Sequence, residues 1–263
     1  MLRLALVLAV ALLAAGCGGS SDGPAPAGEA TTPEVEAPAT SPARILVVTE
    51  TAGFRHGSIP AARTALGAID LRAADYELDF ATLARLPGAL SSVDAVAFVL
   101  TSGELTATPE ARDALIAFVE EGGGFVGVHS AADTFYEFPR YEGLIGSWLR
   151  DHPYTDGTLR RVVADHPATE RLPPEMPVSE ELYRFRDDPR SRGMVPLLEL
   201  SGVSDAPAGE YLPSAWCGRA GSGRTIYTAL GHFDATWQAD WFRDHIDGAL
   251  AWAAGTRPSE ACG

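Results

Sequence analysis

The sequence predicts an α/β protein with a mostly parallel sheet and a small added, partly antiparallel layer. Two observations lead to this prediction. Continuous apolar runs with several β-branched residues, such as residues 44–49 and 95–100, are typical of strands covered on both faces in a parallel sheet. Segments with helical spacing separate such runs, and a strand, helix, strand order favours right-handed βαβ units.

The first half of the predicted domain holds the parallel units. Its strands are predicted at residues 44–49, 76–81, 95–100 and 125–129. A helix is expected at residues 59–69, because Pro60 falls in its first turn, where a missing N–H costs nothing. Thr108 is an N-cap for a second helix, which runs through Glu121 and ends at three glycines, residues 122–124.

Beyond Asp151 the pattern changes to shorter segments that read as strands of the added layer. They are predicted at residues 158–164, 181–185, 196–200, 214–218 and 224–229. The last of these is expected to return to the main sheet. A final helix at residues 239–253 has apolar and acidic faces, so it should pack on the sheet.

The N-terminal 43 residues do not look like part of a packed core. An apolar run at residues 2–13 precedes small residues and Cys17, which is typical of a lipoprotein signal at residues 1–16. We expect Cys17 to be lipidated; the alternative is an ordinary signal peptide in which Cys17 is incidental. Residues 17–43 are rich in Gly, Ser and Pro and read as a disordered tether. The folded domain is then 44–256, with a tail at 257–263, in an extracytoplasmic protein that is lipid-anchored to the cell membrane.

Charge and cysteine content narrow the possible partners. The chain has 35 acidic and 20 basic residues and a formal net charge of −15, so nucleic acid is not an expected partner. Cys217 and Cys262 are the thiols left besides Cys17. An exported protein permits a disulfide between them, and two unpaired thiols are the alternative.

Three histidines follow strands whose carboxyl ends should meet at one edge of the sheet. His56 lies in the loop after the first strand, His129 ends the strand at 125–129, and His232 follows the strand at 224–229. Ligands of open parallel sheets bind at this edge. A single histidine there is equally often structural, but three together predict a working site, with His152, His166 and His245 read as structural.

The segment around His129 has the layout of a nucleophile elbow, a tight turn that lifts one side chain above the sheet. The elbow position holds a histidine instead of a nucleophilic serine or cysteine. Ser130 is one place late for a nucleophile and is expected to cap a helix or bind ligand. Asp133 either caps that helix or orients the imidazole.

Glu181 and Tyr183 are two apart in a predicted strand, so both side chains project from the same face. They are expected to act as general base and donor, or as sugar ligands; a solvated strand edge is the alternative. Trp216 and Trp237 are expected as substrate contacts, because an apolar face with a polar tip suits carbohydrate; core packing is the alternative.

These segments together resemble the ThuA-like (trehalose utilisation) family. The resemblance runs from about Arg44 to Trp252 and is carried by Phe54-Arg-His56, the glycine-rich segment ending in His129-Ser-Ala-Ala-Asp133, Glu181-Leu-Tyr183-Arg-Phe185, and Trp216 through His232. It implies a flavodoxin-like three-layer sandwich, kinship with class I glutamine amidotransferases, and a role in the use of trehalose or other disaccharides. Since His129 stands where the amidotransferase cysteine would be, glutamine hydrolysis by a thiol is not expected.

Two functions from different classes follow. The first is an enzyme that acts on sugars or their keto derivatives, a hydrolase, lyase or isomerase, with His56, His129, His232 and Glu181 in acid–base roles. The same histidines could hold a divalent metal such as zinc. The alternative is a non-catalytic, surface-anchored carbohydrate-binding protein that uses the same cleft. A scaffold role has only the acidic surface in its favour.

Overall fold

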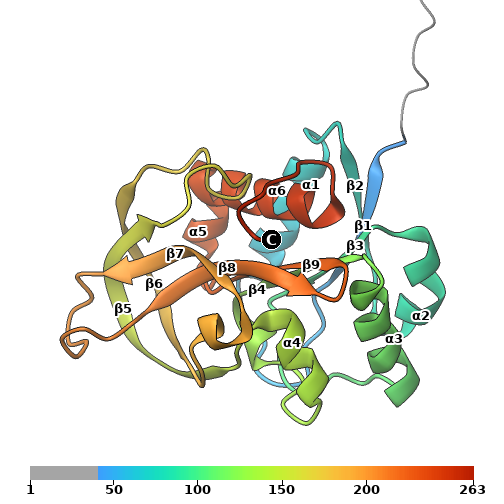
Figure 1. The fold of residues 1–263 in the computed structure, drawn as a ribbon, viewed down its shortest axis with the longest axis horizontal. Coiled ribbons are helices and arrows are strands. Elements are labelled where there is room, and N and C mark those ends of the chain that lie inside the picture. Colours follow the sequence, from blue (N-terminus) through green and yellow to red (C-terminus); the bar gives the residue numbers. More distant parts are fainter. Residues whose placement is uncertain (1–40) are drawn as a thin grey trace, which may run out of the picture. The chain divides into compact units, whose positions relative to one another are not determined.

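A computed structural model describes residues 41–263, and they form one sheet covered by helices on both faces (Figure 1). The strand order is β2-β1-β3-β4-β9-β8-β7-β5-β6. Its parallel half consists of β2 (Tyr76–Phe80), β1 (Ala43–Val48), β3 (Ala95–Val99), β4 (Gly124–Val128) and β9 (Gly223–Thr228). Strands β3 and β4 are buried along their whole length, as the sequence predicts for strands between two helical layers.

The antiparallel strands continue the same sheet beyond β9. They are β8 (Pro213–Ala220), β7 (Val195–Ser201), β5 (Leu149–Arg161) and β6 (Glu175–Phe185). Strand β9 pairs in parallel with β4 and antiparallel with β8, so it joins the two halves. The pairing of β5 with β6 shifts register three times between Leu149 and Asp156, and such irregularities bend a sheet.

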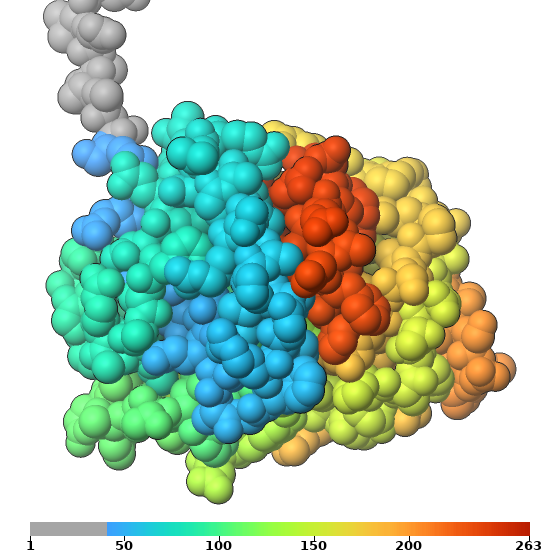
Figure 2. All heavy atoms as spheres, turned by 180° about the vertical axis from the view of Figure 1, so that it is seen from behind, coloured from blue at the N-terminus to red at the C-terminus, as the bar shows by residue number. Residues whose placement is uncertain are grey.

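The helices form the two outer layers. One face carries α1 (Ile59–Asp70), α5 (Asp234–Gln238) and α6 (Asp240–Ala254), which contact one another. The other carries α2 (Leu86–Ala89), α3 (Pro109–Glu120) and α4 (Glu142–Ile145). Seen from behind, α6 lies at the surface between the earlier, blue segments and the yellow ones of the antiparallel half (Figure 2). Short 3₁₀ turns lie at Leu83–Arg85, Leu90–Ser92, His129–Asp133, Pro139–Tyr141 and Pro189–Arg192.

The predicted caps and boundaries hold in the parallel half. The Thr108 side chain accepts a hydrogen bond from the Ala111 N–H at the start of α3, and α1 begins within a residue of Pro60. In the antiparallel half, β5 and β6 begin at Leu149 and Glu175, earlier than the predicted 158 and 181. Proline, glycine and charged residues interrupt their alternation, which is why the pattern hides the extra length.

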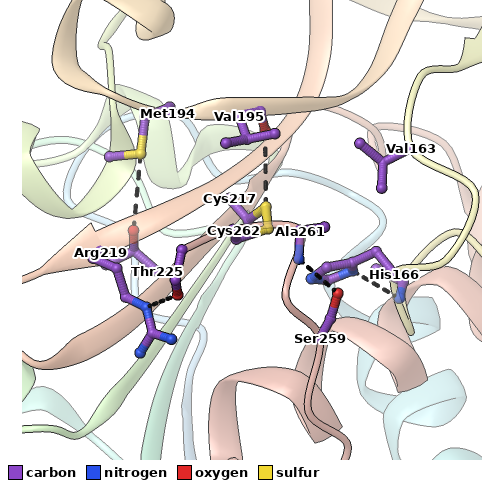
Figure 3. The surroundings of a disulfide bond; sticks show 12 residues. Val163, His166, Met194, Val195, Cys217, Arg219, Thr225, Ser259, Ala261 and Cys262 are labelled. Atoms are coloured by element: carbon purple, nitrogen blue, oxygen red, sulfur yellow. Dashed lines mark hydrogen bonds between the residues drawn. A yellow bond between two sulfur atoms is a disulfide. The ribbon is translucent and has the colours of Figure 1, made fainter.

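The C-terminal segment is fastened to the sheet by the bond between Cys217 in β8 and Cys262, whose Cα atoms lie 5.8 Å apart (Figure 3). Arg257 also binds Asp75 and Asp247 through its guanidinium group. Residues 257–263, which the sequence separates as a tail, therefore pack against the domain. The predicted signal, Cys17 and most of the tether lie outside the described residues. Within residues 41–263, no helix combines the length and apolar character needed to cross a bilayer.

Candidate functional site

Three histidine side chains meet at the carboxyl edge of the parallel strands. His56 follows β1, His129 follows β4 and His232 follows β9. The ring centroids are 4.7 Å apart for His56 and His129, 5.2 Å for His56 and His232, and 5.3 Å for His129 and His232. The expected convergence of the three imidazoles is therefore present in the structure.

His129 is the centre of the cluster and is fully buried. Its φ of 54° is the left-handed conformation in which an elbow lifts its central side chain above the sheet, a costly conformation for a residue with a Cβ. The ring Nδ1 lies 2.7 Å from the carbonyl oxygen of Ala229. Because a carbonyl oxygen only accepts, Nδ1 carries the proton and Nε2 of the neutral ring has one lone pair.

Four polar atoms surround that lone pair. His56 Nε2 is 3.1 Å from His129 Nε2, His232 Nδ1 is 3.3 Å away, Tyr183 Oη 3.0 Å and Glu181 Oε2 3.3 Å. One lone pair accepts one good hydrogen bond, and an ionised carboxylate has no proton to donate to it. The crowding of these atoms around His129 Nε2 becomes favourable if His129 carries a second proton, or if a cation lies between His129 and its neighbours.

The spacing matches a metal site. Ligand atoms of His56, His129, Glu181 and His232 all lie within 4.8 Å of one another. Ligand atoms about 2.0–2.2 Å from a tetrahedral zinc ion are themselves about 3.3–3.6 Å apart. Four of the six separations are 3.1–3.3 Å: the three from His129 Nε2, and the one between His232 Nδ1 and Glu181 Oε2. The two remaining separations, from His56 to His232 and to Glu181, are at most 4.8 Å. The hydrogen bond from His129 Nδ1 to a backbone carbonyl is the outer contact that orients such a ligand.

The pKa values of His56 and Glu181 also favour metal binding. Burial, helped by the neighbouring His129 and His232, lowers the pKa of His56 to about 3, so its ring is neutral and free to bind. Burial alone would raise the pKa of Glu181, but the hydrogen bond and charge of His129, with the charges of His232 and His152, lower it to about 2. Glu181 is thus an ionised carboxylate, and the nearby His56 ring is neutral.

Backbone contacts hold the loops that carry these side chains. Gly103, which follows β3, has a φ of 73°, and a Cβ there would lie 2.5 Å from the backbone nitrogen of Gly53. Glycine at both positions therefore lets the loop that carries His56 pack closely against the loop after β3. The buried Glu180 accepts hydrogen bonds from the backbone N–H of His232 at 3.1 Å and of Phe233, and from the Thr236 hydroxyl. Glu180 is a positioning residue for His232.

A pocket of about 130 Å³ opens beside the cluster. It is lined by Phe54, His56, Asp133, Leu149, His152, Glu181 and Tyr183. His152 Nδ1 lies 3.1 Å from Glu181 Oε1, the oxygen that faces away from His129. Burial raises the pKa of Asp133, which keeps this carboxyl protonated to a higher pH, and burial also raises the pKa of the Tyr183 phenol.

The structure brings most of the predicted residues together. Glu181 and Tyr183 share a face as expected, and Ser130 Oγ lies 3.3 Å from His56 Nδ1. Trp216 and Trp237, expected as substrate contacts, are core residues: their ring N–H groups donate to the carbonyls of Ile145 and Gly231.

Two residues of the site have no clear signal in the sequence. His152 precedes a proline, which favours a structural role, yet it is half-exposed and lines the pocket. Glu180 is adjacent to Glu181, which is the more obvious candidate. The alternation of side chains along a strand is one clue to the role of Glu180. If Glu181 faces the site, Glu180 points to the opposite face of β6, where a buried carboxylate needs hydrogen-bond donors.

Together these features define a flavodoxin-like α/β domain whose site is made of imidazoles and a carboxylate, with a histidine at the elbow position that holds the nucleophile in α/β-hydrolases. The ThuA family model, described as trehalose utilisation, matches residues 44–253. The chain belongs to the ThuA family.

Solved structures agree on the fold. A ThuA-like protein from Bacteroides uniformis is 22% identical with a TM-score of 0.65, over 83% of this chain and 95% of its own. One from Parabacteroides merdae is 19% identical with a TM-score of 0.65, over 84% and 92%. A cytoplasmic protein from Salmonella typhimurium is 13% identical with a TM-score of 0.56, over 80% and 99%. At these identities the likeness shows the fold alone. No curated protein matches the chain in sequence.

Proposed function

We propose that this ThuA-family protein is a divalent-metal-dependent enzyme that carries out acid–base chemistry on a sugar or its keto derivative, as a lyase, hydrolase or isomerase. The observation that carries the proposal is the set of four ligand atoms from His56, His129, His232 and Glu181, which all lie within 4.8 Å of one another, with His129 Nε2 3.1–3.3 Å from the other three. Zinc suits this donor set, because three neutral imidazoles and one carboxylate are among its usual ligands. When bound, such a metal polarises a sugar carbonyl or a water molecule.

The protein groups around the ligands supply the proton chemistry. Asp133, whose pKa is raised by burial, can donate a proton into the pocket. Glu181 is ionised, as a carboxylate ligand must be, and His152 Nδ1 lies 3.1 Å from its outer oxygen. The Tyr183 phenol keeps its proton and can donate a hydrogen bond to a substrate oxygen.

Metal analysis of the purified protein tests the proposal. We expect about one zinc ion per chain, lost in His129→Ala and in His232→Ala because each removes one nitrogen ligand. His152→Gln is the matched control, since it changes a pocket histidine outside the ligand set and should retain the metal. Absence of stoichiometric metal from the parent protein, prepared without chelator, would rule out this proposal.

Product analysis on disaccharides and their keto derivatives separates turnover from binding. Binding without any product would favour the alternative, a carbohydrate-binding protein that uses the same pocket. We also propose export and lipid attachment at Cys17, on the pattern of residues 1–17. Metabolic labelling with a radioactive fatty acid should mark the parent chain and leave Cys17→Ala unlabelled.

A further inference from the structure

Phe54 is a large apolar side chain left uncovered at the mouth of the pocket. It is 64% exposed, and its ring packs edge-on against the His56 ring at 4.8 Å. Among residues 41–263, the exposed large apolar side chains are Phe54, Leu71, Val162 and Phe233. A single exposed apolar side chain is ordinary on a protein surface. What distinguishes Phe54 is that it lines the pocket beside His56 and Glu181.

Besides Phe54 and Leu149, the residues that line the pocket carry carboxyl, imidazole or phenol groups. Asp133 and Glu181 are half-buried, His152 is exposed, and the buried Tyr183 phenol lies behind them. The pocket therefore has one aromatic wall and several hydrogen-bonding groups facing it. A pyranose ring matches this arrangement, because its C–H face is apolar while its rim carries hydroxyl groups.

The size of the pocket limits how much sugar it can hold. Its volume of about 130 Å³ is well below the roughly 300–1,000 Å³ of pockets that enclose drug-sized ligands. A space of this size encloses no more than one sugar ring, so the second ring of a disaccharide would lie outside it.

We propose that this pocket is a subsite for a single sugar ring, with the apolar face of the ring on Phe54 and its hydroxyl groups bound by Asp133 and His152. This inference rests on the proposed function and narrows its substrate class to sugars recognised through one terminal ring. It also assigns His152 a direct contact with substrate, in addition to its contact with Glu181.

Titration calorimetry on the full chain, loaded with zinc, tests the subsite with methyl α-glucopyranoside and trehalose as probes. We expect the two dissociation constants to agree within about threefold, because the second ring finds no subsite. Phe54→Ala should weaken both by about tenfold, through loss of the stacking surface, and Phe54→Tyr should restore binding. Phe233→Ala is the matched control: Phe233 is exposed and packs on the His232 ring at 4.6 Å, but it does not line the pocket.

Three results would overturn the inference: neither probe binds, trehalose binds more than about thirtyfold tighter than the methyl glycoside, or Phe54→Ala binds as the parent does. Zinc content keeps this test separate from that of the proposed function. Zinc at the parental level in Phe54→Ala with unchanged sugar binding would remove the subsite and leave the metal site standing. A parent protein without zinc would remove the metal proposal, whatever the sugars do.

Discussion

Glu180 and Glu181 are neighbours in sequence with different tasks. Glu181 faces the imidazoles, whereas Glu180 points to the opposite side of β6 and holds the backbone of His232. Outer contacts of this kind typically change metal affinity by about 10- to 100-fold when they are removed. The difference follows from the strand geometry, because successive side chains of a strand alternate between faces.

We therefore expect Glu180→Gln to weaken zinc binding by about tenfold or more, measured by competition with a coloured chelator. The amide keeps the size of the side chain but turns an N–H toward groups that also donate. Glu142→Gln is the control: Glu142 is another buried carboxyl, paired with Arg192 away from the cluster. It should lower stability without changing zinc affinity. Equal zinc affinity in the two variants would contradict the positioning role of Glu180.

At the scale of elements, the core of the parallel half was predictable because β1, β3 and β4 each contain a continuous apolar run. The carboxyl ends of parallel strands lie at one edge, so His56, His129 and His232 could be grouped without knowing the loops. The contribution of β5 was not predictable. His152 lies where β5 changes register against β6, and bulges follow from the packing of a whole sheet, not from a local pattern.

The C-terminal element offers a second prediction. The Cys217–Cys262 bond closes a loop of 45 residues in sequence separation. Loop-closure entropy gives an upper value of about 4 kcal/mol for a loop of this size, and measured effects are commonly smaller. Cys217→Ala with Cys262→Ala should lower the free energy of unfolding by about 2–4 kcal/mol in urea. Reductant should lower the urea midpoint of the parent and leave that of the double variant unchanged. A parent midpoint that is the same with and without reductant would show that the bond contributes nothing to stability.

At the scale of the whole molecule, two more histidines lie inside the core, away from the site. His166 and His245 are fully buried, and each ring has an Nε2 without a hydrogen-bond partner. Burial, with the nearby His245, lowers the pKa of His166 to about 4. Burial also lowers the pKa of His245 to about 4, against the hydrogen bond with the Ala168 carbonyl. Both rings are neutral in the folded protein at neutral pH.

This burial makes the fold sensitive to mild acid. Between about pH 6.5 and 4 the unfolded chain binds protons on these rings and the folded chain does not, so stability falls as the pH falls through that window. The cost is on the order of 3 kcal/mol for each ring at the lower end. Urea unfolding from pH 8 to pH 4.5 should show a falling midpoint, with a shallower fall in His245→Gln, whose amide can still donate to Ala168. Comparing each chain with itself at pH 8 removes the packing cost of the substitution, because neither state protonates the rings there. If the midpoints of parent and variant fall in parallel with pH, His245 binds its proton equally well in the folded and unfolded chains. The acid sensitivity would then come from other groups.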